Sequence, residues 1–281
     1  MHKLLLIPLL SSTLFGQFIW HKGGGKLELI EQGKTVLVYN VDPQLPAGVP
    51  EDRKRCCYLS PLYTPAGVVV TDDFPKDHYH HRGLFWGWPH INDKYDIWML
   101  KGGIHPVAVR QTAHPGESAI LETVTTWDVP DQGPIVRETS HMVVFSVNGD
   151  TRPIQIEVKF EALKGPVVLA GSAEPGKSYG GLNIRFAPRT GTIIRTNEGV
   201  LAKDSDRAVF QWAEMEGTFN GKRARVRIIS KDPERAYQWC LRQYGFIGAA
   251  FPGRTDSVKD YTLKPGEPLV MNFRIELTDV R

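Results

Sequence analysis

The sequence predicts an all-β protein, a large antiparallel β-sandwich with few short helices. Several stretches alternate apolar and polar residues with a period of two, as a strand with one buried face does. Two Asn-Gly pairs, at 148–149 and 220–221, border such stretches and are strong hairpin signals. Helix signals are convincing at one place only, so the layers of the core are expected to be sheets.

The first strands are expected between residues 26 and 71. Lys26 to Ile30 and Thr35 to Tyr39 are predicted as strands, with Gln32-Gly33 as the turn that joins them. Residues 41–55 are rich in proline and charge, which is typical of a loop. Gly67 to Thr71 is predicted as a short β-branched strand that ends just before a cluster of histidines.

The later strands show the alternation most clearly. Ala119 to Trp127 and Val136 to Val147 are predicted as strands, and the second ends at the first Asn-Gly pair. From Ile154 to Phe160, and again from Ala224 to Ile228, every second residue is apolar. The last strand, Met271 to Leu277, repeats this pattern.

The single helix is predicted near residue 240. Asp232 can cap its N-terminus, Pro233 suits its first position, and Gly245 would end it. Four larger residues would then share one face of the helix: Tyr237, Cys240, Leu241 and Tyr244.

The N-terminus predicts export. His2 and Lys3 give a short polar start, Leu4 to Phe15 an apolar run, and Gly16-Gln17 a plausible cleavage point. The alternative is a buried first strand. No linker or internal repeat divides the rest of the chain. We therefore expect a signal peptide at 1–16, one β-sandwich domain at 18–281, and a secreted or periplasmic location.

Composition excludes several classes of partner. The formal net charge of +3 is too small to indicate nucleic acid or an anionic membrane, and no later apolar run is long enough for a membrane span. Cys240 could bridge to either Cys56 or Cys57, but no stapled scaffold or zinc ribbon is indicated. The sequence predicts no particular oligomeric state.

Candidate site residues are densest in one stretch, Asp77-His78-Tyr79-His80-His81-Arg82-Gly83-Leu84-Phe85-Trp86-Gly87-Trp88. It contains three of the nine histidines, which can transfer protons or bind metal near neutral pH. In a strand, His78 and His80 would point the same way and could share a divalent metal ion, with His81 opposite. Alternatively, the histidines act on a sugar while Arg82 holds a carboxylate or vicinal hydroxyls.

Aromatic residues would form the floor of such a sugar pocket. Trp86, Trp88 or Trp98 could stack on the apolar face of a ligand. The alternative for each is a place in the core, with the histidines serving a structural role. Because a dense group of ionisable side chains is costly to bury, we expect the cluster as a whole to form a site.

Two later segments are further candidates. In Tyr179 to Arg185, Asn183 and Arg185 would share one face of a strand, although Arg185 could equally be a solvated charge. Arg242 and Tyr244 would lie at the end of the predicted helix, where an ordinary capped terminus is the alternative. The loop carboxylates Glu174, Asp204 and Asp206 are interpreted as solvated charges.

These blocks together resemble a known family. Tyr58 to Gly67, Val70-Thr71, Asp77 to Phe85, Tyr179 to Arg185 and Arg242 to Gly245 are similar, in the same order, to the PmoA-like or DUF6807 family. The family is common among secreted proteins of sugar-degrading bacteria. The resemblance implies a galactose mutarotase-like supersandwich. The label "methane oxygenase" does not suit this chain, since a membrane subunit needs several apolar spans.

The implied fold brings a partial likeness to aldose epimerases. His81, Gly83 and Trp98 are similar to the epimerases' Leu-His-Gly-Gly block and its downstream Trp, and residues 264–267 to their closing turn. The epimerases' second histidine and late glutamate have no counterpart, because Tyr179-Gly180-Gly181 and Ile247-Gly248-Ala249-Ala250 stand there. Simple mutarotation is therefore not expected, and fold alone does not supply an activity.

We expect a secreted carbohydrate-active protein that uses histidine acid/base chemistry of lyase, epimerase or hydrolase type. The alternative is a non-catalytic carbohydrate-binding module. The expected ligand is a small molecule or glycan, with no cofactor unless His78 and His80 hold a divalent metal. The candidate catalytic residues are His78, His80 and His81; the candidate substrate-binding residues are Arg82, Trp88, Trp98, Tyr179, Asn183, Arg185, Arg242 and Tyr244.

Overall fold

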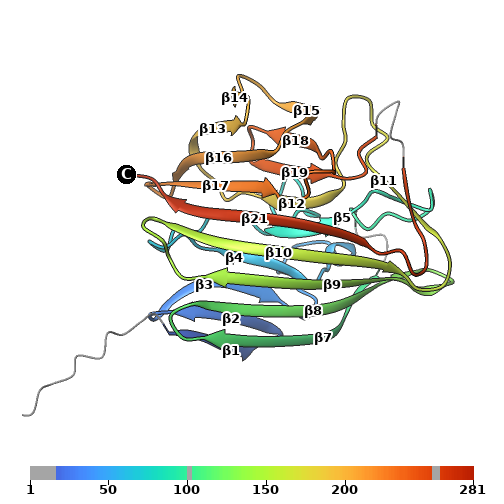
Figure 1. Ribbon diagram of the computed structural model, residues 1–281, viewed down its shortest axis with the longest axis horizontal. Coiled ribbons are helices and arrows are strands. Elements are labelled where there is room, and N and C mark those ends of the chain that lie inside the picture. Colours follow the sequence, from blue (N-terminus) through green and yellow to red (C-terminus); the bar gives the residue numbers. More distant parts are fainter. Residues whose placement is uncertain (1–16, 100–102, 255–259) are drawn as a thin grey trace, which may run out of the picture.

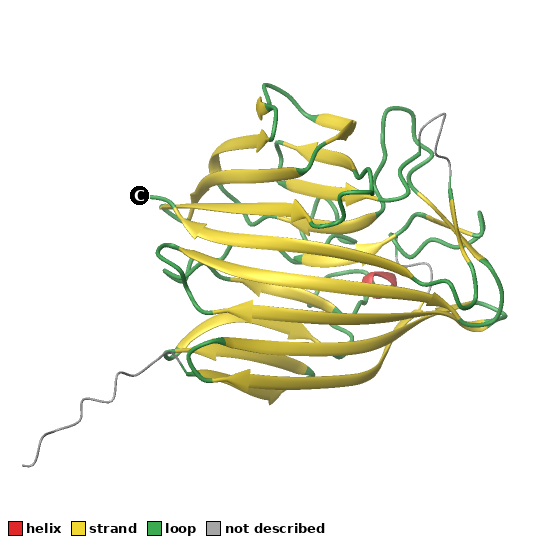
Figure 2. Ribbon diagram, viewed as in Figure 1, coloured by secondary structure: helices red, strands yellow, loops and turns green. Residues whose placement is uncertain are grey.

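The computed structural model describes residues 17–99, 103–254 and 260–281 (Figure 1). Within these ranges the chain forms two nine-stranded sheets and one three-stranded sheet, and every pair of neighbouring strands is antiparallel. The helical content described is one 3-10 turn, Glu51–Arg53, drawn red in Figure 2. The predicted antiparallel β-sandwich with few short helices is confirmed. The predicted signal peptide lies outside the described residues.

The order of strands across each sheet differs from their order along the chain. From one edge to the other, the first sheet contains β1 (Phe18–Gly23), β2 (Lys26–Glu31), β3 (Lys34–Asn40), β4 (Tyr58–Leu62), β5 (Leu84–Gly87), β12 (Gly181–Arg185), β19 (Phe246–Ala250), β18 (Gln238–Arg242) and β15 (Ser205–Val209). The second contains β14 (Gly199–Val200), β13 (Thr190–Thr196), β16 (Trp212–Phe219), β17 (Lys222–Ser230), β21 (Leu269–Asp279), β10 (Thr151–Ala162), β9 (Gly133–Phe145), β8 (Ser118–Val129) and β7 (Gly103–His114). The small sheet contains β20 (Tyr261–Leu263), β11 (Val167–Ala170) and β6 (His90–Ile91).

The predicted hairpins are confirmed at two turns whose central residues both have positive φ angles. Asn220 and Gly221 join β16 to β17 with φ angles of 46° and 82°, and Gln32 and Gly33 join β2 to β3 with 51° and 74°. Positive φ at both central positions matches the twist of the flanking strands, which is why Asn-Gly is such a strong signal. The pair at 148–149 lies between β9 and β10.

Two secondary-structure predictions are wrong. Residues 67–71 make only isolated bridges, Val69 with Tyr63 and Thr71 with Phe186. The predicted helix is absent, because residues 238–242 form β18 between β19 and β15. Instead of capping a helix, the Asp232 carboxylate accepts hydrogen bonds from the backbone and side chain of Asn272 and from the Tyr237 hydroxyl.

The main core fills the space between the two large sheets, but the central strands of the first sheet are buried on both faces. On the face toward the core lie residues such as Trp86, Ile184 and Ile247. The opposite face carries a second apolar cluster: Tyr58, Phe85, Trp98, Cys240 and Phe246. Loops cover this opposite face, and the candidate site lies among them.

Burial of the central strands on both faces explains why the sequence predicted a helix near residue 240. In β18, Trp239 and Leu241 belong to the main core and Cys240 to the second cluster. A strand with apolar residues on both faces shows no polar alternation, so its sequence does not distinguish it from a buried helix. Strand pairing decides the outcome, because this segment forms a tight hairpin with β19 and also pairs with the distant strand β15.

Candidate functional site

The histidine cluster lies in a loop that crosses the outer face of the first sheet, before β5. The amide of His78 donates to the carbonyl of Pro75 at 2.9 Å, and that of His81 to the carbonyl of His78 at 2.8 Å. These consecutive turns replace the extended conformation assumed from the sequence, so the expectation that His81 points away from His78 and His80 is wrong. All three rings gather on one side.

The rings form a column that rises from the second apolar cluster. The His81 ring stacks on Phe246, with centroids 4.9 Å apart, and His78 stacks on His81 at 4.6 Å. Tyr244 stacks on His78 at 5.3 Å, with only 6° between the ring planes. His80 stands edge-on to His81 at 4.5 Å. The column thus joins the loop to β19 and to the Arg242–Phe246 turn.

Asp77 and Arg185 hold His78 in place. An oxygen of the Asp77 carboxylate lies 2.9 Å from Nδ1 of His78, and the carboxylate accepts two hydrogen bonds from Arg185 at 2.9 and 3.0 Å. Partial burial acts to raise the pKa of Asp77, but the hydrogen bonds from His78 and Arg185 outweigh it and lower the pKa. Arg185 also lies 4.8 Å from the centre of the Tyr244 ring.

His80 and His81 are neutral imidazoles over most of the pH range. Burial is the main cause, because it disfavours the charged form, and nearby cations add to it. Together they lower the pKa of His80 to about 3 and that of His81 well below its usual value. The side chain of His78, in contrast, is 37% exposed.

A cavity of about 480 Å³ opens beside the column. Seven predicted site residues line it: His78, His80, His81, Trp98, Tyr179, Arg242 and Tyr244. Arg185 lies just behind this wall, in contact with Asp77 and Tyr244. The structure therefore brings together three segments that are far apart in the sequence.

Sequence reasoning missed six lining residues: Met99, Glu174, Lys177, Asp204, Cys240 and Phe246. Glu174 and Asp204 line the cavity and remain exposed charges, with 54% and 42% of their side chains accessible. The interpretation of Asp206 as a solvated charge is wrong, because its side chain is 14% exposed and forms an ion pair with Arg242. No pattern marks Glu174 and Asp204, since they come from loops 30 residues apart. One signal could have indicated Glu174: it lies close in the sequence to Tyr179, which was already a candidate.

The charged groups of the wall are paired with each other. Arg242 forms an ion pair with Asp206 at 2.6 Å and lies 3.7 Å from Asp204. Glu174 pairs with Lys177 and accepts a hydrogen bond from the Tyr179 hydroxyl at 2.7 Å. Burial and the Glu174 carboxylate raise the pKa of Tyr179 to about 12, so its hydroxyl stays protonated.

Besides Arg185, three predicted substrate-binding residues lie outside the cavity. Arg82 is fully buried and donates to the carbonyls of Tyr79, His81 and Arg53. Trp88 packs in the main core and donates to the carbonyl of Phe251 at 3.0 Å. Arg82 therefore holds the histidine loop together through these carbonyls and does not face the cavity.

Asn183 is the third residue outside the cavity, and its segment shows why. Its amide donates to the carbonyl of Gly181 at 2.7 Å within the buried strand β12. Gly181 has a φ of 114°, and a Cβ there would lie 2.6 Å from the Ala249 carbonyl. Gly181 thus allows close approach to β19, and the neighbouring Gly180 packs against Trp88.

The metal site considered from the sequence, on His78 and His80, stays a prediction. In residues 17–99, 103–254 and 260–281, no group of three His, Cys, Asp or Glu side chains is placed to hold a metal ion. The three imidazoles stack on one another and on aromatic rings. That arrangement differs from the convergent lone pairs that a metal ion needs.

Comparison with known proteins identifies the family. A model of the family of unknown function DUF6807 matches residues 26–281. The chain belongs to DUF6807. The resemblance seen in the sequence is therefore confirmed over almost the whole described chain. A search of curated proteins gave no match. Across the described part of this DUF6807 protein, no helix is both long and apolar enough to cross a bilayer.

Two solved structures are similar to this DUF6807 protein at low identity. One is an aldose epimerase homologue from C. elegans, 9% identical, with a TM-score of 0.41 over 95% of this chain and 100% of that chain. The other is a 4-α-glucanotransferase from Thermococcus litoralis, 11% identical, with a TM-score of 0.33 over 94% of this chain and 37% of that chain. Structural similarity at these TM-scores does not indicate a shared chemistry.

Proposed function

We propose that this DUF6807 protein is a secreted enzyme that acts on a sugar or modified sugar, with His78 as the group that exchanges protons. The observation that carries the proposal is the Asp77–His78 pair beside the 480 Å³ cavity. Small-molecule sites commonly have volumes of about 300–1,000 Å³. Export rests on the apolar run Leu4 to Phe15.

His78 suits proton transfer better than the other two histidines. Asp77 lies at Nδ1, which favours a hydrogen on that nitrogen and leaves Nε2 as the free acceptor. Arg185 fixes the carboxylate in turn. A base oriented by a carboxylate, and exposed to the cavity, has the arrangement that general acid/base catalysis needs. His80 and His81 then act as neutral, hydrogen-bonding parts of the wall.

The wall suits a neutral sugar more than an acidic one. Trp98, Tyr179 and Tyr244 offer ring surfaces, and the charged groups offer donors and acceptors for hydroxyls. The cations nearest the cavity already have carboxylate partners: Arg242 has Asp206, Lys177 has Glu174, and Arg185 has Asp77. A substrate carboxylate would have to displace one of them.

The arrangement favours lyase or epimerase chemistry over hydrolysis. A glycosidase needs two carboxyl groups on either side of the scissile bond, one acting as acid. In this protein Glu174 is held by Lys177 and Tyr179, which lower its pKa and keep it ionised. One positioned imidazole, in contrast, can remove or return a proton at a sugar hydroxyl, or at a sugar carbon next to a carbonyl group.

The second candidate is a non-catalytic carbohydrate-binding module. It is favoured by the same internal pairing, because a wall whose charges neutralise each other supplies hydrogen bonds without a reactive acid or base. On this interpretation His78 would serve as a ring surface beside Tyr244.

Proton NMR on a panel of neutral monosaccharides and disaccharides, in deuterated buffer, separates the two. The enzyme predicts new product signals, or exchange of a sugar C–H for deuterium, that His78→Ala removes while line broadening by binding persists. The matched control is His141→Ala, an exposed histidine on β9 of the other large sheet. Binding of a sugar by the wild-type protein without conversion or exchange would establish the module instead.

A further inference from the structure

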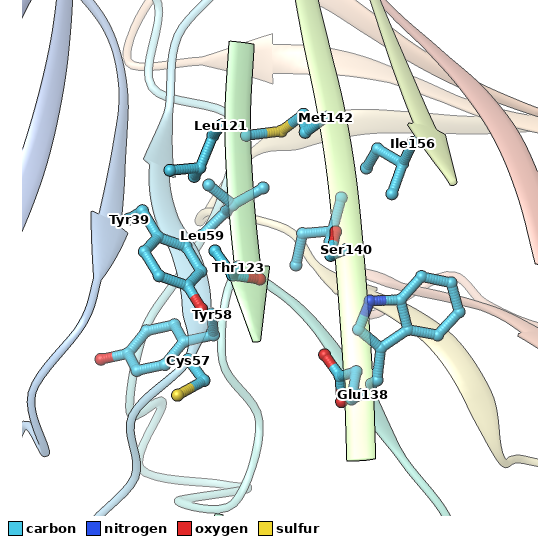
Figure 3. Close-up of a pocket in the computed structure, with 12 residues that line it drawn as sticks. Tyr39, Cys57, Tyr58, Leu59, Leu121, Thr123, Glu138, Ser140, Met142 and Ile156 are labelled. Atoms are coloured by element: carbon cyan, nitrogen blue, oxygen red, sulfur yellow. The ribbon is translucent and has the colours of Figure 1, made fainter. Parts of the chain in front are cut away.

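A second group of reactive side chains lies away from the proposed site. Cys56 and Cys57 are adjacent and buried, immediately before β4, and their Sγ atoms are 3.1 Å apart. Cys57 lines a small cavity of about 30 Å³ between the two large sheets, opposite Glu138 and beside Tyr39 (Figure 3). Cys240 belongs to the other cluster, under the sugar cavity. All three thiols are free.

The backbone explains why the two thiols meet. In an extended strand, neighbouring side chains point to opposite faces. Cys57 instead has a φ of 61°, in the left-handed region that few residues other than glycine adopt, and its amide donates to the Asn40 carbonyl at 2.7 Å. Closing the sulfurs from 3.1 Å to a bond of about 2.05 Å needs a movement of only about 1 Å.

The two thiols differ in the direction of their pKa shifts. The interaction with Cys57 is the main cause that lowers the pKa of Cys56, and the buried Arg55 guanidinium adds to it. The interaction with Cys56, with burial, raises the pKa of Cys57. Because the thiolate is the attacking species, the lower pKa makes Cys56 the first nucleophile and Cys57 the second. Since both thiols are buried, the reaction takes place in local openings of the fold that admit the oxidant. In its protonated form the Cys56 thiol donates a hydrogen bond to the Ile104 carbonyl at 2.9 Å.

We propose that Cys56 and Cys57 are a redox-modification site that a disulfide oxidant converts into a vicinal disulfide. The Cys56 thiolate attacks one sulfur of the oxidant and releases one thiol. Cys57 then loses its proton and attacks the Cys56 sulfur of the mixed disulfide, which releases the second thiol. In total two protein thiols are oxidised and one disulfide is reduced. The site is independent of the sugar cavity and of the proposed enzyme activity.

The test uses the full chain with Cys240→Ser, so that only the pair remains. The protein is reduced, freed of reductant, and incubated folded with oxidised glutathione; it is then denatured, alkylated and weighed by intact mass spectrometry. We expect a mass lower by two hydrogen atoms, with no alkyl group and no glutathione. The control Cys57→Ser in the same background should stop at one glutathione on Cys56, because the second attack is lost.

Two alkyl groups on the oxidised folded protein would overturn the proposal, and so would a disulfide that forms only after denaturation. If the Cys240→Ser protein does not fold, peptide mapping of the oxidised wild-type chain gives the same decision. A peptide with Cys56 joined to Cys57 supports the site, and a bridge from Cys240 to either of them contradicts it.

Discussion

The Asp77 carboxylate lies 2.9 Å from Nδ1 of His78, and its other contacts are with the guanidinium of Arg185. These three residues come from the histidine loop and from β12, more than a hundred positions later. The loop supplies His78, the proposed base, together with Asp77, and the strand supplies the guanidinium that holds Asp77. The position of the Asp77–His78 pair therefore depends on the packing of the loop against the sheet.

Replacing Asp77 with Asn should lower kcat with little change in KM. The amide can still occupy the space, but it no longer favours the His78 tautomer that leaves Nε2 free. General acid/base catalysis contributes about 10²–10⁴-fold, and we expect the variant to lose a substantial part of it. Steady-state kinetics measure this once a substrate is found. Asp93→Asn, on an exposed turn, is the control; equal loss in both variants would contradict the role of Asp77.

The buried imidazoles should make the protein sensitive to acid. An unfolded histidine has a pKa of about 6.5, whereas burial lowers the pKa of His81 well below this and that of His80 to about 3. Below pH 6.5 the unfolded chain binds more protons, so this contribution is complete above pH 6.5 and is lost as the pH falls toward 3.

His81→Phe should reduce that loss, because phenylalanine can stack on Phe246 and His78 without titrating. Chemical denaturation at neutral pH and near pH 5 gives the difference in the free energy of unfolding for each protein. The difference should be smaller in the variant than in the wild type. The control, His141→Phe on the exposed face of β9, should follow the wild type. Identical pH dependence in all three proteins would refute the assignment.

Glu138 should have the opposite pH dependence. Burial raises its pKa to about 7, against the hydrogen bond from Trp127 Nε1 at 2.9 Å and the charge of Arg55, which lower it. The folded protein thus holds a proton that the unfolded chain has already lost. The stabilisation is complete below the unfolded pKa of about 4.3 and is lost as the pH rises through about 7.

Glu138→Gln removes this titration and keeps an acceptor for Trp127. Relative to wild type, the variant should gain stability between pH 5 and pH 8, measured as the urea concentration at the unfolding midpoint. Glu157→Gln, on an exposed position of the neighbouring strand β10, should show no such change. A constant offset for Glu138→Gln at both pH values would mean that Glu138 is ionised throughout.

Local signals predicted much of the fold, and non-local contacts decided the rest. Asn220-Gly221 fixes its hairpin through its own φ angles, so the sequence alone suffices there. Residues 238–242 were misassigned because both faces of β18 are apolar in the folded protein. The histidines were found by their density, but Asp204 was missed because only the fold places it beside them. Arg82 has the charged side chain expected of a site residue, but it is buried like a core residue.

Arg82 gives the sharpest test of that distinction. Its guanidinium is fully buried, lies 3.7 Å from Asp73 through Nε, and donates to three carbonyls, among them that of His81 at 2.7 Å. Lysine has three donors on one compact ammonium group, but it lacks the planar fork of the guanidinium that reaches these separated carbonyls. Hydrogen bonds to charged groups are each worth about 1.5–3 kcal/mol, so Arg82→Lys should lower the free energy of unfolding by at least that amount.

If Arg82 supports the histidine loop from behind, sugar affinity should follow the folded fraction of the Arg82→Lys protein. Affinity measured well below the unfolding temperature would then stay near the wild-type value. Arg110→Lys, at an exposed position on β7, is the control for the same chemical change. A variant that melts with the wild type but no longer binds sugar would return Arg82 to the role that its place in the motif first suggested. Lost stability with retained affinity therefore means that this arginine supports the loop that carries the site. Lost affinity with retained stability means that it contacts the ligand.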